Sequence, residues 1–488
     1  MVGIVSYGGY IPRYRLSRMT VVQNMAWYFP VIMAVAGGEK AVANWDEDAV
    51  SMAVAAAYDC MEGRDRKTLN GIYLASTTLP FADRLNAGIV AAALNVPENG
   101  ATNADFSACM KSGTTASLAA LDAVASGRVT SILVAAADQR RTKMATMLEM
   151  FYGDGAAALL FGNKDVIAEF KGSYSVNCDF VDHYRGSGKD FDYSWEERWT
   201  RDLGYGKIIP EAIAGFLKKT GMKIEDFSKV IYPCYFGGTH KDIGKKIGVD
   251  GAKLQNNLHN NCGDTGAAHP LVMMAAALED AKPGDKILLA SFGQGCDVLA
   301  FEVTDKIKNL KPRKGVKGSL AHRAEFNNYQ KFSKFRDLIK ADLGIRGEAS
   351  SNTSLTVLWR KRKFILGLVG GKCTKCGTPQ IPVLPVCVNP KCHSVKTFED
   401  YEFADKEAKV LMFTSDLLSA SVDPPAVYGM VAFDGGGRTL LDFTDCEASG
   451  VKVGMKVKMS FRKRYTDGTR GFTGYFWKAV PQMEGGAA

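Results

Sequence analysis

Cys109 lies just ahead of an Ala-rich segment whose apolar residues recur at helical spacing and which ends at Ser126 and Gly127. A cysteine at the N-terminal end of a helix faces unpaired backbone N–H groups and the positive end of the helix dipole, and both stabilise a thiolate. The alternative is a small, buried, apolar cysteine without chemistry. Its place at a helix start favours a nucleophilic thiol.

Four further cysteines have the spacing of a metal site. Two residues separate Cys373 from Cys376, four separate Cys387 from Cys392, and glycines and prolines surround both pairs. Two such thiolate pairs suit tetrahedral zinc in a ribbon. The sequence therefore predicts one structural Zn²⁺ ion bound by all four cysteines, and a ribbon without metal is the alternative.

The composition is that of a soluble globular protein with two or three domains. Its 488 residues are 46% hydrophobic and 23% charged, as is typical of such proteins. The apolar stretch 27–37 contains Pro30 and is shorter than the ~20 apolar residues that span a membrane. We find no signal peptide, so we expect a cytoplasmic protein without a membrane contact, whose eleven cysteines form no disulfide framework.

Basic residues cluster at 306–317, 360–363 and 462–464, and the net charge is +9. Such clusters suit either nucleic acid or an anionic cofactor with a phosphorylated nucleotide tail. No RNA- or DNA-binding signature accompanies them, so we expect the anionic cofactor and no nucleic acid.

Apolar strands alternate with small-residue helices through the first two thirds of the chain. Besides the helix after Cys109, helices are expected at 46–61, 87–94, 270–278 and 325–343, and strands at 2–11, 71–75, 131–136, 229–233 and 286–290. This alternation predicts an α/β fold with a largely parallel sheet. The order helix, glycine turn, apolar strand occurs twice, which indicates a tandem duplication of one α/β unit.

Four motifs, in this order, resemble the thiolase superfamily. They are the FSAC run that contains Cys109 and the runs at 151–162 (FYGDGAAALLFG), 260–270 (NNCGDTGAAHP) and 283–295 (PGDKILLASFGQG). The resemblance covers about residues 1–340 and is greatest to hydroxymethylglutaryl-CoA synthase and ketoacyl synthase III. It implies a five-layer αβαβα fold, a homodimer or a higher oligomer, coenzyme A thioesters as substrates, and Cys109 as the acyl acceptor.

Acyl transfer from a thioester also needs hydrogen-bond donors for the tetrahedral oxyanion. We expect the backbone N–H of Cys109 and the turn at Gly293 and Gln294 to form this oxyanion hole, because glycine permits close approach of the backbone.

The chain departs from the synthase pattern at the proton-transfer residues. By ungapped comparison, the synthase glutamate falls on Thr77, its histidine on Pro233 and its asparagine on Asp264. We expect Asp264 to act in the asparagine's place, yet none of these residues performs the original proton transfer unaided. The second cysteine of thiolases is absent as well, with Leu289 at about its position.

Six histidines are available, and histidine is the usual acid or base near pH 7. His269 begins an expected helix and precedes Pro270, as in the GHP motif of thiolases, so it is the predicted acid/base. His240 and His259 are the alternatives.

Short alternating strands from residue 408 onward predict a five-stranded OB barrel, with strands at 410–414, 427–433, 439–443, 456–462 and 472–478. Ribbon and barrel together, with the run YGMVAFDGGGRTLLDF, resemble the acyl-CoA-associated domain that accompanies archaeal acetoacetyl-CoA thiolase. The predicted domains are two thiolase-like halves, a linker, the ribbon and the barrel, at 1–165, 166–343, 344–365, 366–400 and 401–488.

The sequence thus predicts an acyl-CoA condensing enzyme, an acyltransferase like hydroxymethylglutaryl-CoA synthase, which forms or cleaves a C–C bond through an acyl-Cys109 thioester. Thiolase-like Claisen cleavage and a retro-aldol lyase of a CoA thioester are alternatives. A non-catalytic acyl-CoA scaffold, which passes intermediates to a partner thiolase, is the alternative of another class. The presence of Cys109 together with the glycine turns favours the enzyme.

Overall fold

The computed structural model describes residues 1–342, 344 and 354–482. These residues divide into two compact units, one mainly of residues 1–338 and the other mainly of 339–488. The core of the expected linker, at 344–353, lies outside the described residues except for Gly344. Helix α12 (Leu355–Gly367) occupies most of the rest of the predicted linker segment 344–365. Within the described ranges, no helix is both long and apolar enough to cross a bilayer.

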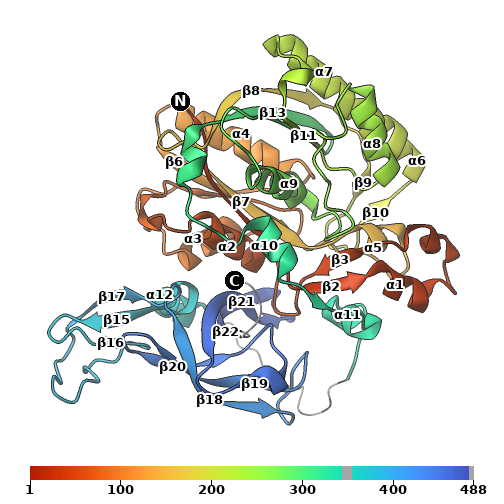
Figure 1. Ribbon diagram of the computed structural model, residues 1–488. Coiled ribbons are helices and arrows are strands. Elements are labelled where there is room, and N and C mark those ends of the chain that lie inside the picture. Colours follow the sequence, from red (N-terminus) through yellow and green to blue (C-terminus); the bar gives the residue numbers. More distant parts are fainter. Residues whose placement is uncertain (343, 345–353, 483–488) are drawn as a thin grey trace. The chain divides into compact units, whose positions relative to one another are not determined.

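The N-terminal unit is built on a nine-stranded sheet with the order β11-β12-β13-β8-β1-β7-β6-β4-β5 (Figure 1). Its strands are β1 (Gly3–Tyr10), β4 (Ile72–Ala75), β5 (Ala104–Phe106), β6 (Ser131–Asp138), β7 (Gly155–Gly162), β8 (Ala168–Asn177), β11 (Lys229–Ile231), β12 (Lys286–Phe292) and β13 (Gly295–Val303). Only two residue pairs join β1 to β8, so this short ladder connects two half-sheets.

The prediction of a largely parallel sheet is wrong. Strand β4 is parallel to β5 and β6, and β11 is parallel to β12, but the other five pairings are antiparallel. The parallel pairs are connected through crossover helices, whereas β12 and β13 follow one another through the tight turn at Gly293 and Gln294. Consecutive strands joined by so short a turn pair antiparallel.

Helices form three layers around the two half-sheets, which confirms the five-layer αβαβα architecture (Figure 1). Helix α2 (Ala49–Cys60) packs on β1, β6 and β7, and α7 (Ile209–Thr220) packs on β8 and β13. Between the half-sheets lie α4 (Ser112–Ala125) and α9 (His269–Leu278), each in contact with strands of both halves. Every residue of α9 is buried, which its small and apolar side chains permit.

Smaller elements complete this unit. They are α1 (Arg18–Met25), α3 (Asn86–Ala93), α5 (Met147–Phe151), α6 (Glu197–Trp199), α8 (Gly237–Lys246) and α10 (Gly315–Ala321), the sheet of β2 (Tyr14–Ser17), β3 (Glu39–Val42) and β14 (Ala324–Glu325), and the hairpin of β9 (His183–Tyr184) and β10 (Tyr193–Ser194).

The helix expected at 325–343 is much shorter, because α11 spans only Tyr329–Phe335. The side chain of Asn328 accepts from Lys331 N at 2.8 Å and so begins the helix, and Asp337 follows its end with a left-handed φ of 56°.

The C-terminal unit contains two further sheets. The ribbon consists of β15 (Val369–Cys373), β16 (Pro379–Gln380) and β17 (Phe398–Glu402). All five predicted barrel strands are present, as β18 (Ala408–Asp416), β19 (Ala426–Phe433), β20 (Arg438–Asp442), β21 (Lys456–Asp467) and β22 (Phe472–Pro481). A bridge between Phe443 and Ala479 links the ends of this five-stranded sheet, as closure of an OB barrel requires.

Candidate active site

Cys109 lies three residues before helix α4, at the end of the turn that follows β5. The preceding residue, Ala108, has a left-handed φ of 82°, which non-glycine residues rarely adopt. The hydroxyl of Ser112 donates to the carbonyl of Cys109 at 2.7 Å and lies 3.7 Å from its sulfur. Such backbone strain commonly accompanies functional residues. Here Ser112, in the first turn of α4, holds the strained loop through its bond to Cys109.

Burial separates Cys109 from most other cysteines. Outside the ribbon, Cys109, Cys178 and Cys446 are partly accessible, while the remaining four are buried. Burial raises the pKa of the Cys60 and Cys262 thiols to about 12 and raises those of Cys234 and Cys296 as well. Thiols held protonated in this way are poor nucleophiles.

A cavity of about 280 Å³ opens at Cys109. The turn between β12 and β13 forms one wall, and Gly293 passes so close to the Cys109 loop that an added Cβ would lie 2.6 Å from Lys111 N. Glycine is therefore required there. The N–H of Gly293 already donates to Gly295 O at 3.0 Å, whereas we find no partner for the N–H of Gln294 within the described residues. The turn predicted for the oxyanion hole thus lies beside Cys109, with Gln294 as its available donor.

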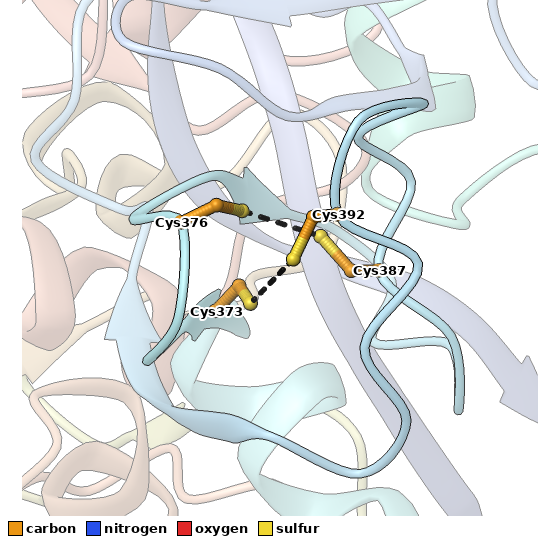
Figure 2. A group of neighbouring side chains, drawn as sticks. All are labelled: Cys373, Cys376, Cys387 and Cys392. Carbon is orange, nitrogen blue, oxygen red and sulfur yellow. Dashed lines mark hydrogen bonds between the residues drawn. The ribbon is translucent and has the colours of Figure 1, made fainter.

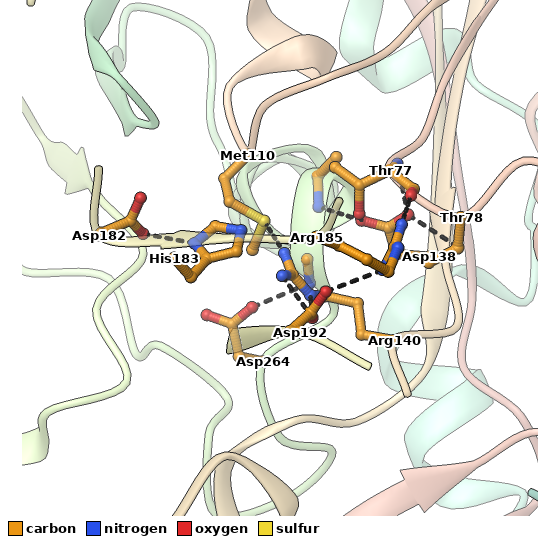
Figure 3. Close-up of polar contacts among 12 residues, drawn as sticks. Thr77, Thr78, Met110, Asp138, Arg140, Asp182, His183, Arg185, Asp192 and Asp264 are labelled. Atoms are coloured by element: carbon orange, nitrogen blue, oxygen red, sulfur yellow. Dashed lines mark hydrogen bonds and ion pairs between the residues drawn. The ribbon is translucent and has the colours of Figure 1, made fainter. Parts of the chain in front are cut away.

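The β9–β10 hairpin forms another part of the wall and brings a histidine into the cavity. Nδ1 of His183 lies 2.7 Å from Oδ2 of the buried Asp182 (Figure 3). Sequence reasoning missed both residues. Their only signal was an Asp-His pair within a polar segment without periodicity, and folding alone brings that segment to Cys109.

Two arginines hold this hairpin in place through one carboxylate (Figure 3). Asp192 accepts from Arg140 at 2.6 and 2.9 Å and from Arg185 at 2.8 Å. Arg185 also donates to the carbonyl of Thr77. Burial disfavours the charge on Arg140, but Tyr152 and Asp192 hold the pKa of its guanidinium above the ordinary value. The pairing joins the hairpin to the loops after β4 and β6.

Thr77, which stands at the synthase glutamate position, is bound by a neighbouring carboxylate. Asp138 accepts from the Thr77 backbone N–H at 2.7 Å and from its hydroxyl at 2.9 Å. The hydroxyls of Ser76 and Thr78 and the N–H of Ala267 donate to the same carboxylate. This cluster, part of which Figure 3 shows, fixes the ends of β4 and β6. A threonine hydroxyl is not a base, so Thr77 does not replace the glutamate in proton transfer.

His269, the predicted acid/base, is not among the residues that line this cavity. The ring is buried, with Nε2 donating to Asn257 O at 2.8 Å and Nδ1 accepting from Thr265 N at 3.1 Å. His269 does not line the Cys109 cavity, and its two ring nitrogens hold the segment before α9. Asp264 does not line the cavity either. Its carboxylate accepts from Gly266 N at 2.8 Å, in the turn that precedes helix α9.

The alternatives His240 and His259 line other cavities. Burial lowers the pKa of His240 to about 4 and lowers that of His259 well below its ordinary value. Both rings are therefore neutral near pH 7, and neither lines the cavity at Cys109.

The four ribbon cysteines converge as predicted (Figure 2). Their sulfur atoms all lie within 4.8 Å of one another, with 3.9 Å between Cys373 and Cys392 and 3.5 Å between Cys376 and Cys387. Tetrahedral zinc with Zn–S bonds of about 2.3 Å needs sulfur atoms about 3.8 Å apart. The Ser394 hydroxyl lies 3.1 Å from Cys373 Sγ and orients that ligand. The site fits a structural zinc ion held by four thiolates.

Family models match three segments of the chain. Residues 217–303 match the C-terminal domain of 3-oxoacyl-[acyl-carrier-protein] synthase III, 367–396 match the rubredoxin-like zinc ribbon domain of ChsH2, and 401–462 match the C-terminal OB-fold domain of ChsH2.

Solved structures show the same fold for the N-terminal unit. A hydroxymethylglutaryl-CoA synthase complexed with CoA superimposes with a TM-score of 0.62 at 18% identity, over 72% of this chain and 94% of that one. The 3-oxoacyl-[acyl-carrier-protein] synthase III of Aquifex aeolicus gives 0.56 at 20% identity, over 62% of this chain and 100% of that one.

Curated relatives carry the assignment further. The hydroxymethylglutaryl-CoA synthase of Methanosarcina barkeri is 30% identical over 349 residues, which is 70% of this chain and 99% of that enzyme. The synthase of Methanosarcina acetivorans is 31% identical over 351 residues, with 70% and 99% covered. The chain therefore belongs to the hydroxymethylglutaryl-CoA synthase family of condensing enzymes in the thiolase superfamily, and carries in addition a zinc ribbon and an OB fold.

Proposed function

We propose that this enzyme transfers an acyl group from a CoA thioester to Cys109 and joins it to a second acyl-CoA by an aldol condensation. The observation that carries the proposal is the meeting of Cys109 and the Gly293–Gln294 turn in one cavity. Two solved structures of the same fold support the choice of substrate, because one is described as a hydroxymethylglutaryl-CoA synthase complexed with CoA and the other as MvaS in complex with 3-hydroxy-3-methylglutaryl coenzyme A.

The geometry supports the first step. Cys109 Sγ attacks the thioester carbonyl carbon, the C–S bond to CoA breaks, and the CoA sulfur takes the proton that the Cys109 thiol gives up. Negative charge develops on the carbonyl oxygen, and backbone N–H groups in a water-poor site stabilise it strongly. We propose the N–H of Gln294 as one donor and the N–H of Cys109, which donates at 3.4 Å to Ser112 Oγ in this structure, as the other. We also expect the protein to act as a homodimer.

A panel of acyl-CoA pairs, assayed for CoA release and for C–C bond formation or cleavage in both directions, tests the function. Cys109→Ser should abolish turnover, because a serine hydroxyl without an adjacent base is a far weaker nucleophile. Cys178→Ser is the matched control, since this thiol lies in the same unit and is also partly accessible.

The panel also separates the alternatives. Turnover by Cys109→Ser at the wild-type rate would favour a retro-aldol lyase without a covalent intermediate. Tight CoA binding without turnover of any pair would indicate a scaffold. Products of Claisen cleavage in place of an aldol product would indicate a thiolase-like reaction.

A further inference from the structure

An aldol condensation requires a base, because a proton must leave the carbon that attacks. The base must stand in the cavity that holds the acyl group on Cys109. The lining of this cavity contains two carboxylates and one histidine, from Asp182, His183 and Asp192. Their existing contacts decide which of them can accept a proton.

Both carboxylates already bind other side chains of the protein. Asp192 uses one oxygen for two bonds from Arg140 and the other for a bond from Arg185. Both oxygens are therefore held in ion pairs with guanidinium groups, and this carboxylate serves to hold the hairpin. Asp182 lies against the ring of His183, with 4% of its side chain exposed.

His183 has one ring nitrogen to spare. Its Nδ1 is 2.7 Å from Asp182 Oδ2, and we find no partner for Nε2 within the described part of the chain. A neutral ring that donates from Nδ1 to a carboxylate keeps Nε2 as a proton acceptor. Nε2 lies on the side of the ring away from Asp182 (Figure 3). With 15% of its side chain exposed, the ring can meet a substrate without free access of bulk water.

The hairpin gives this pair a fixed position. Arg185 is two residues beyond His183 and binds both Asp192 and the Thr77 carbonyl, so both ends of the hairpin are tied to the wall of the cavity. Precise placement of this kind is what proton transfer from carbon needs.

We propose that His183 is the catalytic base of the condensation and that Asp182 is its positioning residue, an inference that rests on the proposed function. The C–H bond of the attacking carbon breaks, and its proton passes to Nε2 of His183. The electron pair of that bond forms the new C–C bond to a ketone carbon of the second acyl-CoA, and the π bond of that ketone breaks. The carbonyl oxygen becomes an alkoxide and takes the proton back from the His183 imidazolium, so the ring ends neutral.

Deuterium uptake from heavy water separates this step from acylation. The full-length enzyme is incubated with acetyl-CoA in D₂O and digested in H₂O, and the Cys109 peptide is weighed by mass spectrometry. The wild type should carry an acetyl group that contains carbon-bound deuterium. His183→Ala should carry an acetyl group with deuterium uptake slowed by about 100-fold or more, the usual contribution of a general base. Added imidazole should restore uptake, which a merely structural role would not produce.

Two more variants complete the design. His322→Gln, an exposed histidine of the same unit, should behave as the wild type. Asp182→Asn should lower the rate of uptake while the KM for acetyl-CoA is kept, and Asp182→Glu should recover part of it. Uptake by His183→Ala at the wild-type rate would overturn the inference, as would an acetylated wild type without deuterium. Absence of the acetyl group from wild-type Cys109 would instead refute the proposed function.

Discussion

Replacing Gly293 by alanine tests the geometry of the cavity. The new Cβ would lie 2.6 Å from Lys111 N and 3.0 Å from Met110 N, where ordinary contacts begin at 3.4 Å. Both atoms are backbone, so the turn and the Cys109 loop must separate by about 0.8 Å. A misplacement near 1 Å can cost about 100-fold in rate, which corresponds to about 2.7 kcal/mol of barrier. We therefore expect acylation of Cys109 to slow by about that factor.

The assay is the single-turnover rate of Cys109 acylation, measured by quenching and intact mass. Gly88→Ala is the control, because its Cβ would meet only Leu85 side-chain atoms at 3.6–3.8 Å. Both variants should remain folded, since overpacking of this kind typically costs about 1–3 kcal/mol of stability. A wild-type acylation rate in folded Gly293→Ala would show that the turn contributes no oxyanion donor.

Three other changes have defined outcomes. Cys376→Ala should release one zinc ion and melt the ribbon while the N-terminal unit keeps its thermal transition; metal analysis that finds no zinc in the wild type would contradict this. Because burial lowers the pKa of His240 from 6.5 to about 4, its neutral ring stabilises the fold fully above pH 6.5 and loses this contribution as the pH falls toward 4. Denaturant unfolding should therefore show about 2 kcal/mol less stability at pH 5 than at pH 7 from this ring, and His240→Gln should remove that difference. Truncation after Leu338 should leave Cys109 acylation intact but impair condensation, if the barrel presents the second acyl-CoA; equal losses in both steps would exclude that role.

Many of the helices and strands could be predicted from local sequence patterns. The apolar runs of β6 and β12, the small-residue helices α4 and α9, and the five barrel strands were all predictable, because each has a composition or a spacing that shows within a few residues. The antiparallel pairings were not, because a strand's direction depends on its connection and partner. The length of α11 was missed because its start depends on a single cap, Asn328, and because the left-handed Asp337 follows its end.

The residues of the candidate sites were likewise predictable only in part. Cys109 was recognisable from its place before a helix, and the four ribbon cysteines from their spacing. The structure brings Cys109 beside the Gly293–Gln294 turn and the four ribbon sulfur atoms within reach of one ion. His269 carried a motif, yet both its ring nitrogens serve the backbone and side chains around it. His183 carried none, because the hairpin that bears it is held at the cavity by contacts between distant residues, such as that of Asp192 with Arg140, 52 residues away in sequence. Such long-range ion pairs have no local signature.

The most direct test of the central claim is to trap the acyl-enzyme. Wild-type protein is mixed with acetyl-CoA, quenched with acid and digested, and each cysteine peptide is weighed. We predict one acetyl group per chain on Cys109, none on Cys178 or Cys446, and none at all in Cys109→Ser. Steady turnover with no acyl group on Cys109, or an acyl group on another cysteine, would contradict the account.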